Sequence, residues 1–171
     1  PMEYQNHIFD ALMNTGKTLG LKPFGIRAMD SLRIEKSYRL VGTEMSIEYA
    51  PFESGLHRFV KMDKGDFTGR AALAAWVEKG FENAFVTLEV HDVIDADVLG
   101  NNPILKDGKT VGRATGGGYG WRLGKSLALG MVRPDLAAVG TELEIEILGK
   151  RHRVTVLEES PYDPGNEKIR A

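Results

Sequence analysis

The chain has 171 residues, of which 42% are hydrophobic, so it can form one domain, or two small ones, around a real core. Its 22 basic and 24 acidic residues give a formal net charge of -2, which argues against a nucleic-acid-binding surface. No uncharged apolar run reaches the roughly 18 residues of a membrane span, and no signal peptide is recognisable, so we expect a cytoplasmic protein with no membrane and no nucleic-acid partner. The sequence has no cysteine, which excludes disulfides and thiolate zinc sites, and its four histidines show no ligand spacing, so we expect no metal site.

Two helices are predicted at the start of the chain. Residues 4–19 carry apolar side chains at the 3.6-residue period of a helix, and Gly20 suits the left-handed conformation that commonly ends one. Pro23 prevents immediate helical continuation, and the apolar spacing after it predicts a second helix over residues 24–34. The first helix has the pattern of a packing helix.

The following segment, residues 36–67, is punctuated by glycine and proline and carries apolar residues only in short groups. We expect irregular structure with one short strand over residues 59–62, and loops of this length in a compact domain usually have a function. A third helix follows, because the apolar residues up to Val77 have helical spacing and Gly80 ends the pattern. We expect Trp76 to anchor this helix in a core.

After Gly80 the apolar period changes from that of a helix to the alternation of a strand. Asp107-Gly108 suits a two-residue type I′ turn, and Gly149-Lys150 separates the last two strands, so we predict two hairpins. The predicted strands are residues 84–90, 104–106, 109–113, 127–132, 143–148 and 151–156. Six short strands are typical of a small antiparallel barrel or sandwich. We therefore predict a helical half over residues 1–81 and a strand half over residues 82–171.

Three consecutive glycines, residues 116–118, suggest a phosphate-binding loop, but no Gly-Lys-Ser/Thr follows at P-loop spacing. A backbone bend between strands, needing close approach or positive φ, is the preferred interpretation. Tyr119 and Trp121 beside this bend could stack on a flat ligand, or could pack between the two halves of the chain.

Several ordered motifs carry a family resemblance. They are Asp30-Ser-Leu-Arg-Ile-Glu35, Pro51-Phe-Glu-Ser-Gly-Leu56, Lys64-Gly-Asp-Phe-Thr-Gly-Arg70 and Val111–Ala128. In this order they resemble the second half of the T-protein of the glycine cleavage system, a tetrahydrofolate-dependent aminomethyltransferase. The stretch from Arg27 to Lys36 is more similar to the folate-binding halves of dimethylglycine and sarcosine dehydrogenases. The resemblance implies an α+β fold, in which the helical part of a folate-binding domain precedes a six-stranded antiparallel β-barrel.

The resemblance also implies one-carbon transfer to tetrahydrofolate and points to four binding residues. Arg27 and Arg33 suit the carboxylates of a folate glutamate tail, because a guanidinium binds a carboxylate through two hydrogen bonds. Glu35 belongs to the same charged set, and Tyr119 suits stacking on the pterin or aminobenzoyl ring. Alternatively, the charged set is a salt-bridge network that fixes the irregular segment. Its members are Arg27, Arg33, Glu35, Arg39 and Glu44.

The one-carbon donor depends on the branch of the family. In the aminomethyltransferase it is an aminomethyl-lipoyl carrier protein. In the dehydrogenase-linked branch it is a small methylated amine oxidised by a flavin domain, so FAD is expected in a missing N-terminal domain. The substrate-binding arginine of the family is replaced here by Met29, which argues against glycine cleavage itself. The alternatives are a tetrahydrofolate-dependent demethylase of another methylated substrate and a non-catalytic folate-binding module.

Pro1 resembles the proline of a Glu-x-x-Val-Pro segment of the family, so the chain is interpreted as a fragment. By resemblance, a pterin-binding glutamate and an acid/base aspartate would lie before Pro1, which makes the missing N-terminal half of the same protein a further expected partner. No Ser/His/Asp order, paired carboxylate motif or dinucleotide fingerprint stands out in the sequence. We therefore assign no catalytic residue and expect this chain alone to be inactive.

Overall fold

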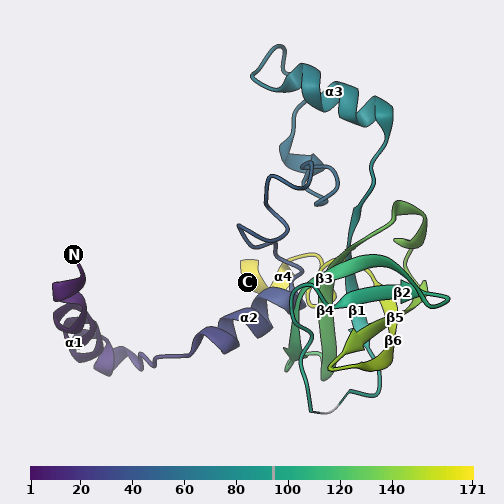
Figure 1. Ribbon diagram of the computed structural model, residues 1–171. Coiled ribbons are helices and arrows are strands. Elements are labelled where there is room, and N and C mark those ends of the chain that lie inside the picture. Colours follow the sequence, from purple (N-terminus) through teal and green to yellow (C-terminus); the bar gives the residue numbers. More distant parts are fainter. Residues whose placement is uncertain (94) are drawn as a thin grey trace.

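A computed structural model describes residues 1–93 and 95–171 and contains a closed six-stranded antiparallel β-barrel, with three longer helices before it in the chain (Figure 1). The helices are α1 (Gln5–Gly16), α2 (Ile26–Glu35), α3 (Arg70–Lys79) and α4 (Glu167–Arg170). The strands are β1 (Ala84–Val90), β2 (Pro103–Lys106), β3 (Lys109–Gly120), β4 (Lys125–Val132), β5 (Glu142–Ile147) and β6 (Lys150–Leu157). The predicted α+β fold and six-stranded antiparallel barrel are confirmed.

The barrel closes because β1 pairs with β4 on one side and with β6 on the other, which gives the strand order β1-β4-β3-β2-β5-β6. Val86, Leu88 and Val90, alternate residues of β1, are buried, as the alternation of the sequence predicted. Apolar side chains from all six strands form one core. Because closure pairs every strand on both sides, the barrel can support other elements without exposing a sheet edge.

Two hairpins of the barrel were predicted from turn residues. Asp107 and Gly108 have φ of 51° and 74°, which confirms the predicted two-residue turn between β2 and β3. The turn between β5 and β6 lies one residue earlier than predicted. Leu148 and Gly149 have φ of 49° and 77°, and Lys150 already pairs with Ile147. A turn of this kind needs positive φ at both of its residues, and the strand register assigns those positions to Leu148 and Gly149.

The three glycines, residues 116–118, lie within β3 opposite β4, so the phosphate-binding interpretation is wrong. The register shifts between Ala114 and Gly116, which confirms a bend, but none of the three glycines has positive φ. Close approach is the reason for the glycine at position 117. A Cβ there would lie 2.6 Å from the Cβ of Val98 and 2.8 Å from the backbone oxygen of Leu127.

Helix α1 forms where the apolar period predicted it, with 3₁₀ turns on either side and Gly20 at φ 72°. It lies away from the barrel, joined to α2 by an extended linker (Figure 1). Ile8, Phe9 and Leu12 on this helix are exposed. The apolar stripe that predicted a packing helix is therefore present, but the described residues do not cover it.

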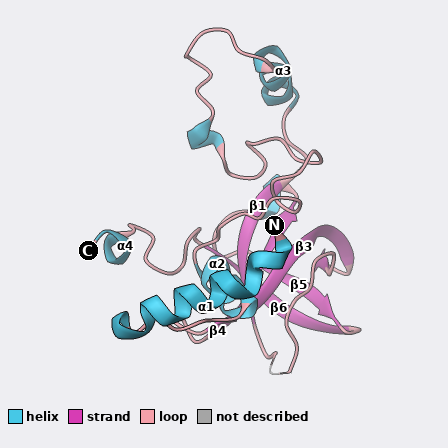
Figure 2. Ribbon diagram, turned by 90° about the vertical axis from the view of Figure 1, so that its left-hand side faces the viewer, coloured by secondary structure: helices cyan, strands magenta, loops and turns pink. Residues whose placement is uncertain are grey.

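Residues 56–81, which we call the arm, leave the barrel and return to it just before β1. Two views show α3, within the arm, standing apart from the barrel (Figures 1 and 2). The predicted strand over residues 59–62 is wrong, because His57–Phe59 form a 3₁₀ turn and no described strand lies alongside to pair with the segment. The prediction of Trp76 as a core anchor is also wrong, since this residue is 37% exposed.

The base of the arm is held together by a buried carboxylate. Glu53 accepts hydrogen bonds from the backbone N–H groups of Ala50 (2.9 Å) and Asn83 (2.9 Å). Phe52 and Phe81 stack at the same place, with ring centroids 5.8 Å apart. The helical and strand halves are thus connected on both sides of residue 81, and their predicted division there stays a prediction.

The C-terminal segment returns to the end of α2. The N–H of Tyr162 donates to the backbone oxygen of Glu35 at 3.1 Å, and Lys36 donates to the backbone oxygen of Asp163 at 2.6 Å. None of the helices in the described part of the chain has the length and apolar character needed to cross a bilayer. Within the same residues, no group of three or more acidic, histidine or cysteine side chains is arranged to hold a metal ion.

Candidate functional site

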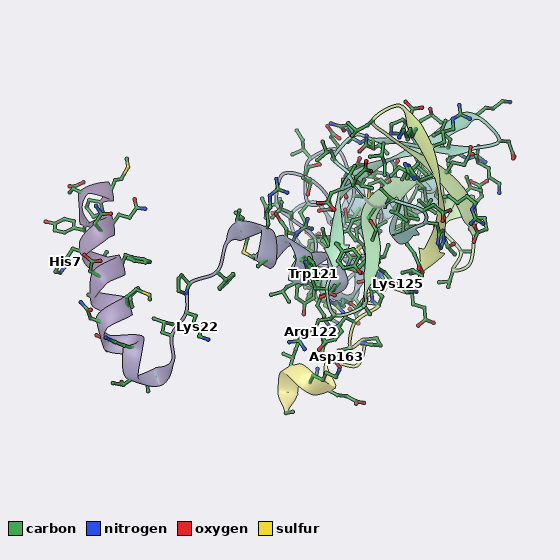
Figure 3. All side chains as sticks on the ribbon, turned by 90° about the horizontal axis from the view of Figure 1, so that it is seen from below. His7, Lys22, Trp121, Arg122, Lys125 and Asp163 are labelled. Atoms are coloured by element: carbon green, nitrogen blue, oxygen red, sulfur yellow. The ribbon has the colours of Figure 1, made fainter. Side chains whose placement is uncertain are left out.

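Helix α2 and the hairpin that joins β3 to β4 border an open cavity of about 370 Å³. Its lining residues are Arg27, Ala28, Ser31, Leu32 and Glu35 from α2, and Trp121 and Arg122 from the hairpin. The cavity therefore combines two guanidinium groups, a hydroxyl and an indole ring. Figure 3 shows Trp121 and Arg122 together at the hairpin, on the same side of the barrel as α2.

The hairpin is attached to α2 by the carboxylate of Glu35. This side chain is 1% exposed, and its Oε1 accepts the backbone N–H groups of Arg122 at 2.6 Å and Leu123 at 3.1 Å. Ser31 adds a second link by donating to the backbone oxygen of Tyr119 at 2.6 Å. Because two side chains of one helix hold the backbone of the hairpin, the position of Trp121 relative to α2 is fixed.

Two aromatic rings project from this hairpin. Tyr119 and Trp121 pack edge to face, with centroids 4.9 Å apart and an interplanar angle of 74°. Trp121 is 79% exposed and also lines a second cavity, of about 500 Å³. The backbone of Tyr119 is at the seam with α2, but its ring is half exposed, so an open aromatic surface is available for stacking.

The two other arginines of the predicted charged set have structural partners. Arg33 donates from Nη1 to the backbone oxygen of Tyr38 at 2.8 Å and pairs with Asp30 at 3.4 Å. Arg39 pairs with Glu159 and lies over the ring of Phe85, with its Cζ 3.9 Å from the centroid. The ion-pair partners of these two arginines, Asp30 and Glu159, lie outside the predicted charged set, so these contacts do not join its members to one another.

Glu44 is a fully buried member of the charged set. Burial alone would raise the pKa of this carboxyl, but hydrogen bonds from the hydroxyls of Thr115 and Thr43 and from the amide of Leu40 lower it below its ordinary value. The carboxylate is therefore charged at neutral pH and holds the irregular segment against β3.

Of the four predicted binding residues, Arg27 and Glu35 line the first cavity and Tyr119 lines the second. Arg33 lines neither of the two. Arg122 was not among the predicted binding residues. The available signal in the sequence was its position one residue after Trp121, but only the docking of the hairpin on α2 brings it to the cavity.

The chemistry of the first cavity is that of a binding site. Two guanidinium groups suit carboxylates, and an exposed indole suits a flat ring. The one carboxylate that lines it, Glu35, has its Oε1 occupied by two backbone amides. Among the described lining residues, we identify no nucleophile with an adjacent base.

Two family models match the chain. The GCVT N-terminal domain matches residues 1–64, and the glycine cleavage T-protein C-terminal barrel domain matches residues 83–163. Human mitochondrial dimethylglycine dehydrogenase is 40% identical over 153 residues, which are 89% of this chain and 18% of that protein. The aminomethyltransferase of Desulfitobacterium hafniense is 34% identical over 158 residues, which are 92% of this chain and 42% of that protein.

The crystal structure of the glycine cleavage system aminomethyltransferase T from Bartonella henselae shows the same fold. It superposes with a TM-score of 0.81 at 23% sequence identity, and the match covers 96% of this chain and 45% of that one. The chain therefore spans less than half the length of these relatives.

Proposed function

Because this chain belongs to the glycine cleavage T-protein family, we propose that it is the folate-binding and barrel portion of an enzyme that transfers a one-carbon unit to tetrahydrofolate. The observation that carries the proposal is the cavity between α2 and the β3–β4 hairpin, where Arg27, Arg122 and an exposed Trp121 come together. A folate has the two features that these side chains suit, a flat ring system and the carboxylates of its glutamate tail.

The residues of the cavity have distinct roles in this proposal. Trp121, assisted by Tyr119, stacks on the aminobenzoyl or pterin ring, and Arg27 and Arg122 pair with glutamate carboxylates. Glu35 acts through the hairpin that it holds rather than through direct contact, because its Oε1 already accepts two amides. Arg33, with its own partners, supports α2 in the same indirect way.

The remaining parts of the enzyme are proposed to come from the rest of a longer protein. Apolar side chains on α1 and α2 lie open in this chain; Ile26, for example, is 71% exposed. Large exposed apolar surfaces mark interaction sites, and the relatives are more than twice as long as this chain. We infer that these surfaces pack against an N-terminal half that supplies the acid/base group and the carboxylate for the pterin edge.

We propose the dehydrogenase-linked branch for the one-carbon donor. In that branch a flavin domain carrying FAD oxidises a small methylated amine, and tetrahydrofolate traps the resulting carbon. Met29 supports it, because this half-exposed residue stands where the family has a substrate-binding arginine. The competing donor is an aminomethyl-lipoyl carrier protein. A cytoplasmic location is part of the proposal and needs a direct test by tagging, since the human relative is named mitochondrial.

Titration calorimetry with 5-formyltetrahydrofolate tests the proposal on the full-length protein. Arg27→Ala and Arg122→Ala should each weaken binding about ten-fold, because a lost hydrogen bond to a charged group corresponds to at least about 1.4 kcal/mol. Arg151→Ala, at the far hairpin of the barrel, is the matched control and should leave the dissociation constant unchanged. If all three variants bind 5-formyltetrahydrofolate with the same affinity, folate does not bind in this cavity.

The same titration on residues 1–171 alone tests the need for the rest of the protein. One open wall forfeits most of the burial of a ligand, so we expect a dissociation constant of about 1 mM or weaker. Micromolar binding by this chain would show that its pocket is complete. Binding by the full-length protein without turnover of any methylated amine or aminomethyl donor would favour the non-catalytic folate-binding module.

A further inference from the structure

The end of α2 holds a buried ammonium group that the proposed folate contacts do not use. Lys36, the residue after the helix, is 7% exposed. Its Nζ donates hydrogen bonds to the backbone oxygens of Tyr162 (3.1 Å) and Asp163 (2.6 Å) and to Oδ1 of Asn166 (2.7 Å). An ammonium has three donors, so all of them are satisfied. The ion pairs of the described residues do not include Lys36, so neutral oxygens hold its charge.

These oxygens belong to residues 158–170, which we call the C-terminal strap. Three strap residues, Ser160, Asp163 and Asn166, have φ of 56°, 50° and 56°. Residues with a side chain rarely adopt this left-handed conformation, although Asp and Asn do so more readily than most. Every residue of the strap is described and none is buried, so apolar packing contributes little to its position. The strap is therefore held mainly by its hydrogen bonds.

The strap makes further hydrogen bonds with the same turn of the chain. The N–H of Tyr162 donates to the backbone oxygen of Glu35 at 3.1 Å, and the N–H of Ser160 donates to Oγ of Ser37 at 2.9 Å. Glu35 and Lys36 are consecutive, yet the carboxylate of the first holds the β3–β4 hairpin and the ammonium of the second holds the strap. The end of α2 is thus fixed from two sides.

The anchored C-terminal end of α2 sets the direction of the rest of the helix. Helix α2 contacts the barrel through β3 and β4, while Ile26 at its start is open. Arg27 lies eight residues before Glu35, about 12 Å along a continuous helix. A small rotation at the anchored end therefore moves the guanidinium of Arg27 relative to the hairpin that carries Trp121.

We propose that Lys36 is a positioning residue for the cavity between α2 and the hairpin. It pins the C-terminal strap to the end of α2, and the strap and hairpin together set the direction of the helix that carries Arg27. The link to ligand binding rests on the proposed function, whereas the pinning of the strap does not.

Amide hydrogen exchange of this chain tests the pin directly. Lys36→Met keeps the length and the apolar stem of the side chain but removes all three donors. The hydrogen-bonded amides of Ser160, Tyr162 and Asn166 should exchange about ten-fold faster or more, and those of Arg122 and Leu123 should also accelerate. Lys22→Met is the matched control, because this exposed lysine lies on the linker between α1 and α2 (Figure 3). This control should leave the exchange rates of the strap amides and of the Arg122 and Leu123 amides unchanged.

A second, milder variant tests the same contact with less risk of unfolding the protein. Asn166→Gly removes one acceptor of Lys36 while the glycine accepts φ 56° without strain, so strap exchange should accelerate without a change in the barrel amides. If the strap amides of both variants exchange at the wild-type rate, Lys36 does not hold the strap in place. A loosened strap with unchanged Arg122 and Leu123 amides would overturn the positioning role.

Folate affinity separates this proposal from the proposed function. In the full-length protein, Lys36→Met should weaken 5-formyltetrahydrofolate binding several-fold, and Lys36→Arg, which restores donors, should recover part of the loss. Unchanged affinity in Lys36→Met, with tight binding by the wild type, would contradict positioning. If the wild type binds no folate at all, the proposed function fails, and the exchange experiment still decides whether Lys36 pins the strap.

Discussion

The carboxylate of Glu35 accepts the backbone N–H of Arg122 at 2.6 Å, although the two residues are 87 positions apart in the chain. This contact joins the last turn of α2 to the tip of the β3–β4 hairpin. It determines that the helix and the side chains of Trp121 and Arg122 face one cavity. A residue chosen from the sequence as a ligand contact thus has a demonstrable role in shaping the cavity.

Glu35→Ala tests that role. The substitution leaves two hydrogen-bonding amides of the hairpin without their acceptor and opens a void, so the free energy of unfolding should fall by about 2–4 kcal/mol. Chemical denaturation measures it. Glu82→Ala, an exposed glutamate, is the control and should change the free energy by less than about 0.5 kcal/mol. A loss of that small size in Glu35→Ala would show that the contact does not hold the hairpin.

Glu44 predicts a specific pH dependence of stability. Its folded-state pKa is lowered, so its stabilisation is fully present above the unfolded-state pKa and is lost as the pH falls through the folded-state pKa. The difference in unfolding free energy between wild type and Glu44→Gln should be largest above about pH 5 and shrink in more acidic solution. A difference that grows on acidification would contradict the lowered pKa.

Gly117→Ala tests the close approach between β3, β4 and the loop that carries Val98. The added methyl group would lie 2.6 Å from the Cβ of Val98, so overpacking should lower the free energy of unfolding by about 1–3 kcal/mol. Gly116→Ala, one residue earlier, meets only the end of Arg33 at 3.7 Å. This control should be close to neutral, and equal losses in both variants would point to strand propensity rather than to packing.

The division of the chain after residue 81 predicts that residues 82–171 fold without the helical half. This segment should give a dispersed amide spectrum, but it should unfold more easily than residues 25–171. The longer segment keeps Ile34, which is buried against Leu127 and Leu129. Thermal unfolding of the two segments measures the difference. A random-coil spectrum for residues 82–171, with the full chain folded, would move the boundary into the helical half.

The sequence by itself determined those features that depend on a few neighbouring residues. Alternation in Val86, Leu88 and Val90 requires a strand with one buried face, and Asp107-Gly108 can adopt the two positive φ angles of a tight turn. Gly20 ends a helical stretch for the same local reason. Local periodicity also placed the three longer helices and five of the six barrel strands near their observed bounds. Strand β3 extends to Gly120, seven residues beyond its predicted end, and α4 was not predicted.

The tertiary structure alone decided which side chains meet. Arg33 and Glu35 are two residues apart on one helix, yet one pairs with its own loop and the other holds a distant hairpin. Arg122 enters the cavity only because the hairpin docks on α2. Phe59-Val-Lys-Met62 has strand-forming residues but no strand beside it, and Trp76 has helical spacing but no core in the described residues. Local patterns encode backbone preference, whereas burial and partners depend on contacts between segments far apart in the chain.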